Sequence, residues 1–476
     1  MNFFDAIVVF FEKILLPRWM APEWMHPVEV VGFYVTLVIG LLFTVCYTYQ
    51  FLYVFLALVH PPKKYKDAPK TKRYAAIIAA RNEENVLPAL LQSLKGQTYP
   101  ADLIDIYVIA DNCTDGTAQV AREMGAIVFE RQNKERVGKG YALEYLFDRI
   151  AETKGLRAYD AYMVFDADNV LRANYVEEMH KAYCAGYKVL TSYRNSKNYG
   201  KNWVSAGYAL WFLRESRHLQ NPRSIIGSSA AISGTGFLVD SSIIERNGGW
   251  KHFLLTEDIE FTADCIVHGE RVGYCHWAEL FDEQPETFRQ SWRQRKRWAK
   301  GMFQVIRKYG AKLLKGTLKL RWSCFDMMMN ITPAFLLSTV QLVSTAVLYI
   351  VYFFMTGSSS KVLFHYLLDF LMFGYGIFFV LGFFALISEW KKIHCNKLRA
   401  VLLLFTFPLF MLTYIPISLA AFFSRRVEWK PVAHKYSVSV ADVEKDEVNE
   451  DRPEEKDEEK GEESPALPEE QNEKAN

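Results

Sequence analysis

The sequence lacks the patterns that identify several common classes of protein. Its seven cysteines contain no C-x-x-C pair, which argues against a zinc site and against a disulfide framework. It has no G-x-S-x-G nucleophile elbow, no internal repeat and no nucleic-acid-binding motif, so we expect neither a serine hydrolase nor a nucleic-acid partner. Free thiols are typical of a reducing compartment.

Charged residues are almost absent from four long stretches. Between residues 28 and 59 the one formally charged residue is Glu29, and three more apolar blocks occupy residues 327–356, 362–388 and 400–423. A helix of about 20 apolar residues crosses the hydrocarbon core, so each block is long enough to span a membrane. The first block lacks the basic n-region, short apolar core and cleavage site of a signal peptide. The sequence therefore predicts an anchored, multi-pass protein of the cell membrane.

The region between the first two blocks has mixed charge and regular glycine and proline punctuation, which is typical of a soluble α/β domain. Six basic residues between Lys63 and Arg73 follow the first block, and the positive-inside rule then puts this domain in the cytosol. The predicted organisation is an N-terminal interfacial segment at 1–27, a transmembrane helix at 28–60, a cytosolic domain at 61–315, interfacial and transmembrane helices at 316–425, and a C-terminal segment at 426–476.

The last apolar block leaves two topologies open. If all three C-terminal blocks cross the membrane, Arg425, Arg426 and Lys430 fall on the outer side, against the positive-inside rule. Pro408 and Pro416 instead allow a broken or re-entrant block that leaves the tail in the cytosol.

The C-terminal tail differs in composition from the rest of the chain. Residues 441–476 contain 16 acidic and five basic residues, so we expect this tail to be disordered. The formal net charge of the whole chain is +2, and the remainder is therefore strongly cationic. Such a surface suits a membrane or an anionic small substrate.

Strands alternate with helical segments after the first apolar block. Residues 73–80, 104–110 and 126–131 have strand patterns, and helical patterns follow the first two. This alternation predicts βαβ units and a mostly parallel sheet, in which ligands bind at the carboxyl ends of the strands. The polar clusters that follow the strands are Arg81–Glu84, Asp111–Asp115, and the pair Asp166 and Asp168. We expect all three clusters at one edge of the sheet.

The segment YMVFDADNV, residues 162–170, ends a predicted buried strand with two carboxylates. Because side chains alternate along a strand, Asp166 and Asp168 would point to the same face and repel each other unless a cation lies between them. Mg²⁺ binds carboxylates together with phosphate oxygens. A turn held by Asp and Asn hydrogen bonds is the alternative, and the position at a strand end favours the metal.

Six motifs follow one another between residues 74 and 301: AARNEE, DNCTDGT, GKG, FDADN, TEDIEF and QRKRW. In this order and spacing the sequence resembles the family 2 glycosyltransferases, and specifically the membrane-embedded branch of cellulose, hyaluronan, chitin and poly-N-acetylglucosamine synthases. The resemblance implies an α/β fold of the GT-A nucleotide-sugar transferase type, with a mostly parallel sheet flanked by N- and C-terminal transmembrane helices.

The resemblance implies a donor site for a UDP-sugar. Its residues would be Ala80, Arg81, Asn82, Glu83, Asp111, Lys139, Asp166 and Asp168, with Asp168 and Asp166 ligating Mg²⁺ or Mn²⁺. A carboxylate at Asp111 can accept a hydrogen bond from a uracil N–H, whereas a turn explains Asn82 equally well. Lys139 precedes a helix and suits a diphosphate, although a solvated lysine in a turn has the same pattern.

Residues 254–269 predict a helix with Thr256 as N-cap and Gly269 as C-cap. Glu257 and Asp258 would then complement the helix dipole. The resemblance implies that this pair is catalytic, with Asp258 as the general base that removes a proton from the acceptor hydroxyl. The two roles are compatible.

Residues 292–301, WRQRKRWAKG, predict a basic helix. Gln294, Arg297 and Trp298 stand at i, i+3 and i+4 and so share one face. Contact with anionic lipids explains the basic residues but not this face. The resemblance implies that Arg297 binds the departing diphosphate, that Trp298 is a platform for the acceptor sugar, and that Gln294 and Arg295 belong to the same site. This motif is typical of family members that extend polymers.

We therefore expect an inverting, processive β-glycosyltransferase that extends a polysaccharide from a UDP-sugar at the cytosolic face and exports it. Its partners would be the sugar donor, a growing glycan or a lipid acceptor, and membrane lipids. A transferase that adds one or few sugars to a lipid is the main alternative. An inactive scaffold and a transporter are further alternatives.

Overall fold

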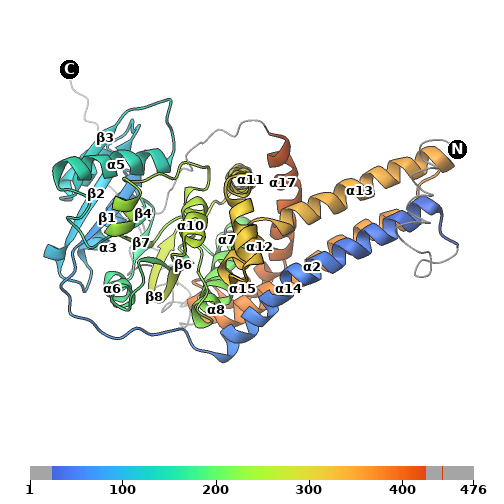
Figure 1. Cartoon of the computed structure of the whole chain (residues 1–476), viewed down its shortest axis with the longest axis horizontal. Coiled ribbons are helices and arrows are strands. Elements are labelled where there is room, and N and C mark those ends of the chain that lie inside the picture. Colours follow the sequence, from blue (N-terminus) through green and yellow to red (C-terminus); the bar gives the residue numbers. More distant parts are fainter. Residues whose placement is uncertain (1–23, 425–441, 443–476) are drawn as a thin grey trace, which may run out of the picture.

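The computed structural model describes residues 24–424 and residue 442. The predicted interfacial segment up to residue 23 and the predicted tail beyond residue 424, apart from residue 442, lie outside the described residues. An α/β domain forms one side of the molecule, and long helices project from the other side (Figure 1).

The strands are β1 (Tyr74–Ala80), β2 (Ile104–Asp111), β3 (Ile127–Arg131), β4 (Ala161–Asp166), β5 (Val170–Leu171), β6 (Val189–Ser196), β7 (Phe237–Asp240) and β8 (Val272–Asp282). The helices of the α/β domain are α3 (Leu87–Lys95), α4 (Thr117–Glu123), α5 (Lys139–Thr153), α6 (Tyr175–Cys184), α7 (Trp203–Arg214), the π-helix η4 (Glu215–Gln220), α8 (Asn221–Ile225), α9 (Ser241–Arg246) and α10 (Glu257–His268). The helices of the other side are α2 (Pro27–Val59), α11 (Phe288–Leu318), α12 (Trp322–Ile331), α13 (Pro333–Thr356), α14 (Lys361–Ser388), α15 (Lys397–Leu404), α16 (Phe407–Leu412) and α17 (Tyr414–Phe423). Two short 3₁₀ turns, η3 (Ala101–Leu103) and η5 (Trp390–Lys392), complete the described elements.

The strands form one sheet in the order β3-β2-β1-β4-β7-β6-β8-β5. Strands β1 and β2, β1 and β4, β2 and β3, and β6 and β8 pair in parallel, while β7 runs antiparallel to β4 and β6. The predicted mostly parallel sheet is confirmed, and the predicted strands coincide with β1, β2 and β3 to within one residue at each end. The carboxyl ends of β1, β2 and β4 therefore lie at one edge.

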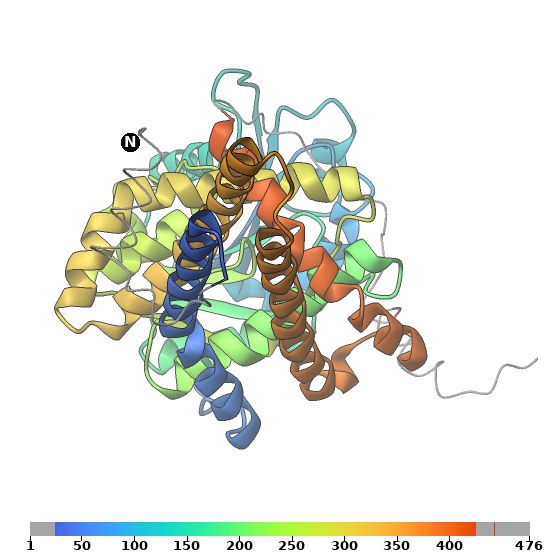
Figure 2. The ribbon, with the colours of Figure 1, turned by 90° about the vertical axis from the view of Figure 1, so that its right-hand side faces the viewer.

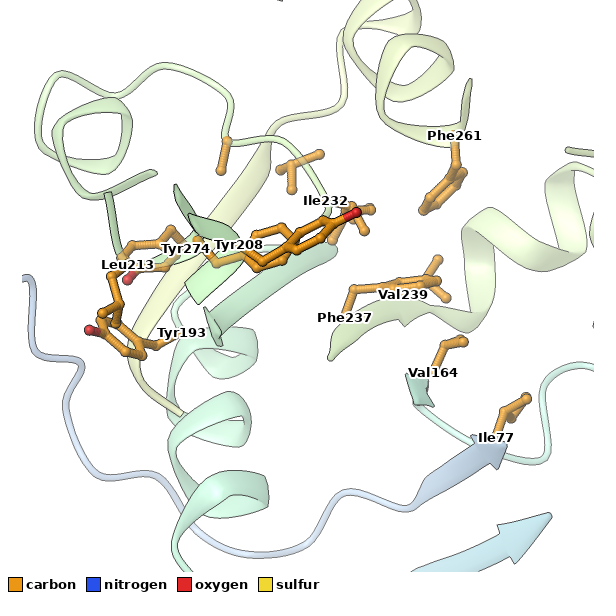
Figure 3. Close-up of a cluster of buried hydrophobic side chains, with 14 of the residues drawn as sticks. Ile77, Val164, Tyr193, Tyr208, Leu213, Ile232, Phe237, Val239, Phe261 and Tyr274 are labelled. Atoms are coloured by element: carbon orange, nitrogen blue, oxygen red, sulfur yellow. The ribbon is translucent and has the colours of Figure 1, made fainter. Parts of the chain in front are cut away.

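Alternate residues of β1 belong to two different apolar layers. Ile77 packs with Val164, Val239 and Phe261 on one face of the sheet (Figure 3). Ile78 lies in the layer on the opposite face, under α3. Full burial of each such side chain stabilises the fold by about 1.5–3 kcal/mol, which fixes the register of the strand and hence the position of its last residue.

Three described helices are long and apolar enough to cross a membrane: Pro27–Val59, Leu336–Thr356 and Lys361–Ser388. Figure 2 looks along these helices from the side on which they project. The last apolar block is not one straight helix, because α15 and the following segment Phe407–Phe423 are bent by 43° at a short break. Pro408 lies in the first turn after this break, so the predicted break is confirmed.

Both ends of the bent segment contact the α/β domain or α11. At its start, Arg399 Nη2 donates a hydrogen bond to the carbonyl oxygen of Lys201 at 2.9 Å. At its end, Lys300 Nζ lies 2.7 Å from the carbonyl oxygen of Ser424. The chain therefore returns after α17 to the side from which α15 began.

A buried ion pair joins the domain to the projecting helices. Arg223 donates to both carboxylate oxygens of Asp326, at 2.7 and 2.9 Å. The hydroxyls of Tyr49 and Tyr53 on α2 donate to the same carboxylate, at 2.9 and 3.0 Å. Breaking one partner of a buried pair costs about 3–5 kcal/mol, so α2, α8 and α12 form a stable joint.

Candidate active site

A cavity of about 1410 Å³ begins at the carboxyl ends of β1, β2 and β4 and continues between α2, α13, α14 and α17. Of the fourteen predicted site residues, all except Asn82 and Arg295 line it. The twelve that line it are Ala80, Arg81, Glu83, Asp111, Lys139, Asp166, Asp168, Glu257, Asp258, Gln294, Arg297 and Trp298. Predicted site residues from segments that are far apart along the chain therefore line one shared cavity.

Asp111 is a buried carboxylate at the end of β2. Arg131 Nη1 donates to its Oδ1 at 2.5 Å, and Asn112 Nδ2 donates to the same oxygen at 3.0 Å. The sequence reasoning missed Arg131, although its place at the end of the neighbouring strand β3 is the same signal that identified Asp111. The arginine keeps the carboxylate oriented in the cavity wall.

Asn82 has the turn role that was its alternative. Its φ is +58°, and its Oδ1 accepts a hydrogen bond from the Thr114 backbone nitrogen at 2.8 Å. Its Nδ2 donates to Thr114 Oγ1 at 3.1 Å. Asn82 therefore joins the loop after β1 to the loop after β2 and does not line the cavity.

The two carboxylates of the DAD segment reach the cavity in different ways. Strand β4 ends at Asp166, and Asp168 lies in the turn that follows, so the prediction that strand alternation puts both on one face is wrong. The turn is held by Asn169 and Thr235, whose side-chain oxygens accept from the Asp166 backbone nitrogen at 3.1 and 2.8 Å. Asp168 Oδ2 accepts from the Glu283 backbone nitrogen at 3.0 Å. The turn interpretation therefore describes this segment, and both carboxylates line the cavity.

Carboxylates are crowded around this turn. Burial raises the pKa of Asp282 to about 6, and the nearby Asp168 carboxylate adds to this increase while Arg194 opposes it. Arg194 Nε donates to Asp282 Oδ2 at 2.7 Å. The sequence reasoning missed this pair, although FDEQ (281–284) repeats the pattern of a buried strand that runs into acidic residues.

Lys139 begins α5 and enters the cavity. Its Nζ lies 2.5 Å from Asp166 Oδ1 and 2.8 Å from the carbonyl oxygen of Gly234. Burial opposes its charge, but the carboxylates of Asp166, Glu257 and Asp258 outweigh that effect and raise its pKa. Lys139 is therefore a protonated cation between two groups of carboxylates.

Helix α10 brings Glu257 and Asp258 to the cavity at its first turn. Burial and the neighbouring Asp258 raise the pKa of Glu257 to about 7. Burial also raises the pKa of Asp258, against the opposing charges of Lys139 and Arg297. A carboxylate whose pKa is raised towards neutrality is a better proton acceptor, as a general base requires.

Helix α10 begins after the predicted N-cap residue, Thr256, and ends at the predicted C-cap residue, Gly269. Thr256 is the N-cap residue but makes no side-chain cap hydrogen bond, and its hydroxyl has no partner among the described residues. Gly301 of α11 packs directly on it, because a Cβ at this glycine would lie 2.5 Å from Thr256 Oγ1. Gly269 ends the helix in the left-handed conformation, as predicted. Close packing of α11, rather than capping, positions the acidic turn.

Helix α11 presents Gln294, Arg297 and Trp298 to the cavity. Arg297 Nη1 donates to the Leu255 carbonyl oxygen at 2.9 Å, next to the acidic turn. The Trp298 ring meets the Tyr208 ring edge-on, with centroids 5.7 Å apart. Gln294 Oε1 is buried without a hydrogen-bond partner among the described residues. An acceptor of hydrogen bonds and an aromatic surface thus stand side by side.

Arg295 lies on the other face of α11, away from the cavity. It is fully buried, and its Nη1 donates to the Phe410 carbonyl oxygen at 2.9 Å and to Thr413 Oγ1 at 2.8 Å. Its guanidinium also lies over the Phe410 ring, 4.1 Å from the centroid. The structure therefore separates Arg295 from the other residues of its motif and makes it a tie between α11 and α16.

The far part of the cavity lies between the projecting helices and contains polar groups. Thr36, Gln341 and Asp369 line it from α2, α13 and α14. Gln341 Nε2 donates to Thr36 Oγ1 at 3.0 Å, while Gln341 Oε1 is buried without a partner among the described residues. At 1.5 Å per residue, Thr36 and Asp369 lie about 12–14 Å along α2 and α14 from the first residues of these helices, a distance close to half the thickness of a bilayer core.

Comparisons with known proteins agree on the class of the α/β domain. A sequence model described as "Glycosyltransferase like family 2" matches residues 69–301. The chain is 29% identical over 285 residues to "Probable glycosyltransferase YdaM" of Bacillus subtilis, which covers 56% of this chain and 63% of that protein. It is 25% identical over 273 residues to "Beta-monoglucosyldiacylglycerol synthase" of Nostoc sp., covering 55% and 56% of the two chains.

A third relative is "Poly-beta-1,6-N-acetyl-D-glucosamine synthase" of Staphylococcus aureus, 24% identical over 236 residues, which cover 48% of this chain and 54% of that protein. The chain thus matches little more than half the length of these curated relatives. Among solved structures, the mannosyltransferase PcManGT from Pyrobaculum calidifontis, in complex with GDP-Man and Mn²⁺, covers 77% of this chain and 98% of that one, with a TM-score of 0.51 and 15% identity. This likeness shows the GT-A-like fold.

Proposed function

We propose that the protein is an inverting, processive β-glycosyltransferase that extends a polysaccharide from a UDP-sugar and exports it. The match of residues 69–301 to the sequence model described as "Glycosyltransferase like family 2" supports this proposal. The observation that carries this proposal is the continuity of the cavity. The same cavity contains the carboxylates at the strand ends, the acidic turn at Asp258, and the polar groups between the projecting helices at Gln341 and Asp369.

Asp258 accepts the proton of the acceptor hydroxyl in this mechanism. The hydroxyl oxygen forms a bond to C1 of the donor sugar as the bond between C1 and the diphosphate oxygen breaks, and the electron pair leaves with UDP. Attack from the face opposite UDP turns an α-linked donor into a β-linked product. Arg297 and Lys139 stabilise the negative charge that grows on the departing diphosphate.

A divalent cation fits the carboxylates at the end of β4. Asp168 and Asp166 would hold Mg²⁺ or Mn²⁺. Both carboxylates line the cavity next to Asp282, whose pKa is raised mainly by burial and to a smaller extent by the charge of Asp168, and a cation would reduce this repulsion. Within the described residues no three His, Cys, Asp or Glu side chains are already arranged around a metal position, so the diphosphate oxygens would complete the ligand set. The ion would neutralise charge on the diphosphate.

The acceptor side of the cavity suits a sugar. Trp298 offers an apolar ring face, and the unpaired Gln294 Oε1 accepts a hydrogen bond from a sugar hydroxyl. Farther along, Gln341 Oε1 and Asp369 offer further acceptors at the depth of the membrane. Polar groups in a membrane span are costly unless they serve a function, and a path for a hydroxyl-rich chain is such a function.

We further propose three membrane crossings, by α2, α13 and α14, with the α/β domain in the cytosol of a cell-membrane protein. The two ends of the bent segment α15–α17 contact the domain side through Arg399 and Lys300, which favours a segment that enters without crossing. Arg425, Arg426 and Lys430, which lie outside the described residues, would then follow on the cytosolic side, in agreement with the positive-inside rule.

A second candidate function is the transfer of one or few sugars to a lipid. The observation in its favour is that Thr44, Thr48 and Phe51 of α2 line the cavity and are also exposed on the surface. The cavity thus opens sideways, where acyl chains would lie around the helix.

UDP release from purified protein in detergent, with Mg²⁺ or Mn²⁺ and a panel of UDP-sugars, tests the proposal when combined with product sizing. One donor that gives UDP and a high-mass, water-soluble product supports it. Products one sugar long that partition into organic solvent would favour the lipid acceptor. No turnover with any donor would contradict both.

A further inference from the structure

Arg214 is a buried arginine at the place where the cavity meets α2. It is the last residue of α7, its exposed fraction is 3%, and it lines the cavity. Its Nη2 donates to Gln50 Oε1 at 2.7 Å, and its guanidinium lies over the Trp211 ring, 4.8 Å from the centroid. Its Nε has no hydrogen-bond partner among the described residues. A donor is therefore buried in the cavity wall without an acceptor.

Nearby arginines are matched by carboxylates, whereas Arg214 is not. Arg217 Nε lies 3.4 Å from Glu389 Oε1, and Arg223 lies 2.7 Å from Asp326. Among the described residues no carboxylate oxygen lies within 4.0 Å of the Arg214 guanidinium. A buried charge without a close ion pair is costly, so an anionic ligand bound next to Arg214 would reduce this cost.

The charge of Arg214 persists at neutral pH. Burial lowers its pKa to about 10, and the Glu215 carboxylate opposes this decrease. Glu215 itself accepts hydrogen bonds from Gln220 Nε2 at 3.1 Å and from Ser233 Oγ at 3.3 Å. It also begins the π-helix η4, a departure from α-helical geometry that is frequent at functional sites.

The cavity is open to the surface close to Arg214. Its partner Gln50 and the exposed residues Thr48 and Phe51 all lie on α2 and line the same cavity. Tyr47, one turn farther along, donates its hydroxyl to the Met329 carbonyl oxygen at 3.3 Å, where the span of α13 is about to begin. Arg214 thus lies at the level where lipid headgroups meet the domain.

We propose that Arg214 binds the phosphate of an anionic membrane lipid whose headgroup enters the cavity from the exposed side of α2. A guanidinium suits phosphate because its N–H groups donate in pairs to two oxygens. The acyl chains would remain along α2, and the headgroup would lie in the cavity that also contains Asp258. The inference rests on the proposed function in one respect, since it makes this lipid the acceptor of the first sugar.

Direct lipid binding tests the proposal without turnover. The full chain is placed in nanodiscs of phosphatidylcholine that contain either phosphatidylglycerol or diacylglycerol, and lipids retained after release are counted by native mass spectrometry. We expect retention of phosphatidylglycerol over diacylglycerol by the wild type. Arg214→Gln should reduce that retention about tenfold or more, because a charge-assisted pair is lost, and Arg214→Lys should restore part of it.

The matched control is Arg307→Gln, which removes an exposed positive charge of α11 that does not line the cavity. Equal loss in this variant would show attraction to the basic surface and would overturn the proposal. Unchanged retention in Arg214→Gln would overturn it as well, as would full displacement of the lipid by inorganic phosphate, which would show a site for a free anion. Thermal unfolding of each variant establishes that it is folded. UDP release is measured separately, so that a failure of the proposed transferase function is distinguished from a failure of lipid binding.

Discussion

The ammonium group of Lys139 lies between the Asp166 carboxylate, at 2.5 Å, and the Gly234 carbonyl oxygen, at 2.8 Å. Asp168, two residues farther along, is instead oriented by the backbone nitrogen of Glu283 at 3.0 Å. The two carboxylates of the DAD segment therefore have different partners. Asp166 forms an ion pair with Lys139, and the release of this lysine leads to the first prediction.

Asp168→Asn should weaken metal-dependent UDP binding more than Asp166→Asn does. The first change removes a carboxylate that we propose as a metal ligand, and we expect a loss of about tenfold or more in UDP affinity, similar to that seen when metal-site partners are lost. The second change frees Lys139 to approach the diphosphate, which offsets part of the loss. Calorimetric titration with UDP, with Mn²⁺ or with a chelator, measures both. Equal losses of UDP affinity in the two variants would contradict the proposal that Asp166 and Asp168 have different roles.

Asp258→Asn should reduce turnover by about 10²–10⁴-fold, the usual contribution of a general base, while UDP affinity changes little. Glu270→Gln is the matched control, since it removes a carboxylate just beyond the same helix that forms a surface ion pair with Arg246 at 3.0 Å. Such surface pairs contribute about 0–1 kcal/mol. UDP release and UDP binding are measured for both. Retained turnover in Asp258→Asn would exclude this base.

The rate should rise as pH increases above the usual pKa range of an aspartate. A general base must be deprotonated, and burial raises the pKa of Asp258 and of its neighbour Glu257, the latter to about 7. Arg297 opposes the rise at Asp258, so Arg297→Gln should move the acidic limb of the kcat/KM profile to higher pH. Arg297→Lys, which keeps the charge, should leave the limb near its original position. If the acidic limb of the profile does not move in Arg297→Gln, a group other than Asp258 is responsible for that limb.

Arg295→Met should lower stability without changing UDP affinity. Hydrogen bonds of a charged group contribute about 1.5–3 kcal/mol, and this change removes two of them to α16 and Thr413. The melting temperature in detergent and the UDP dissociation constant measure the two effects, with Arg307→Gln as the control. A large loss of UDP affinity in a well-folded Arg295→Met protein would contradict this expectation and would support the original prediction that Arg295 contributes to the diphosphate site.

A membrane-impermeant maleimide tests the three crossings. Ser358 lies in the connection between α13 and α14, so Ser358→Cys should be labelled in intact cells. The native Cys184 is exposed on the α/β domain and should be labelled only after permeabilisation. The reverse pattern would place the domain outside the cytosol.

Strand register and the common cavity could be predicted from the sequence because both depend on local patterns. Apolar strands that end in polar residues identified Asp111 and Asp166, and the parallel order of their strands brought them together. The position of Asp168 could not be predicted, because the point at which β4 gives way to a turn depends on side chains from a distant loop, such as Thr235.

Helical spacing also identified the face of Gln294, Arg297 and Trp298, but it could not identify the partner of the opposite face. Arg295 contacts Phe410, which lies 115 residues away along the chain. Thr256 is the N-cap residue as predicted, but its hydroxyl makes no cap hydrogen bond, and Gly301 of another helix packs against it. In both cases a contact between segments that are far apart along the chain explains why the structure could not be predicted from the local sequence.

The buried joint of Arg223, Asp326 and the two tyrosines of α2 has a consequence for movement. It fixes the α/β domain to helices whose depth the bilayer sets, so the acidic turn at Asp258 stays at one height above the membrane. If a chain grows here, the catalytic groups cannot follow its end. Each addition then requires the product to advance by the length of one sugar, along a path whose direction the helices already determine.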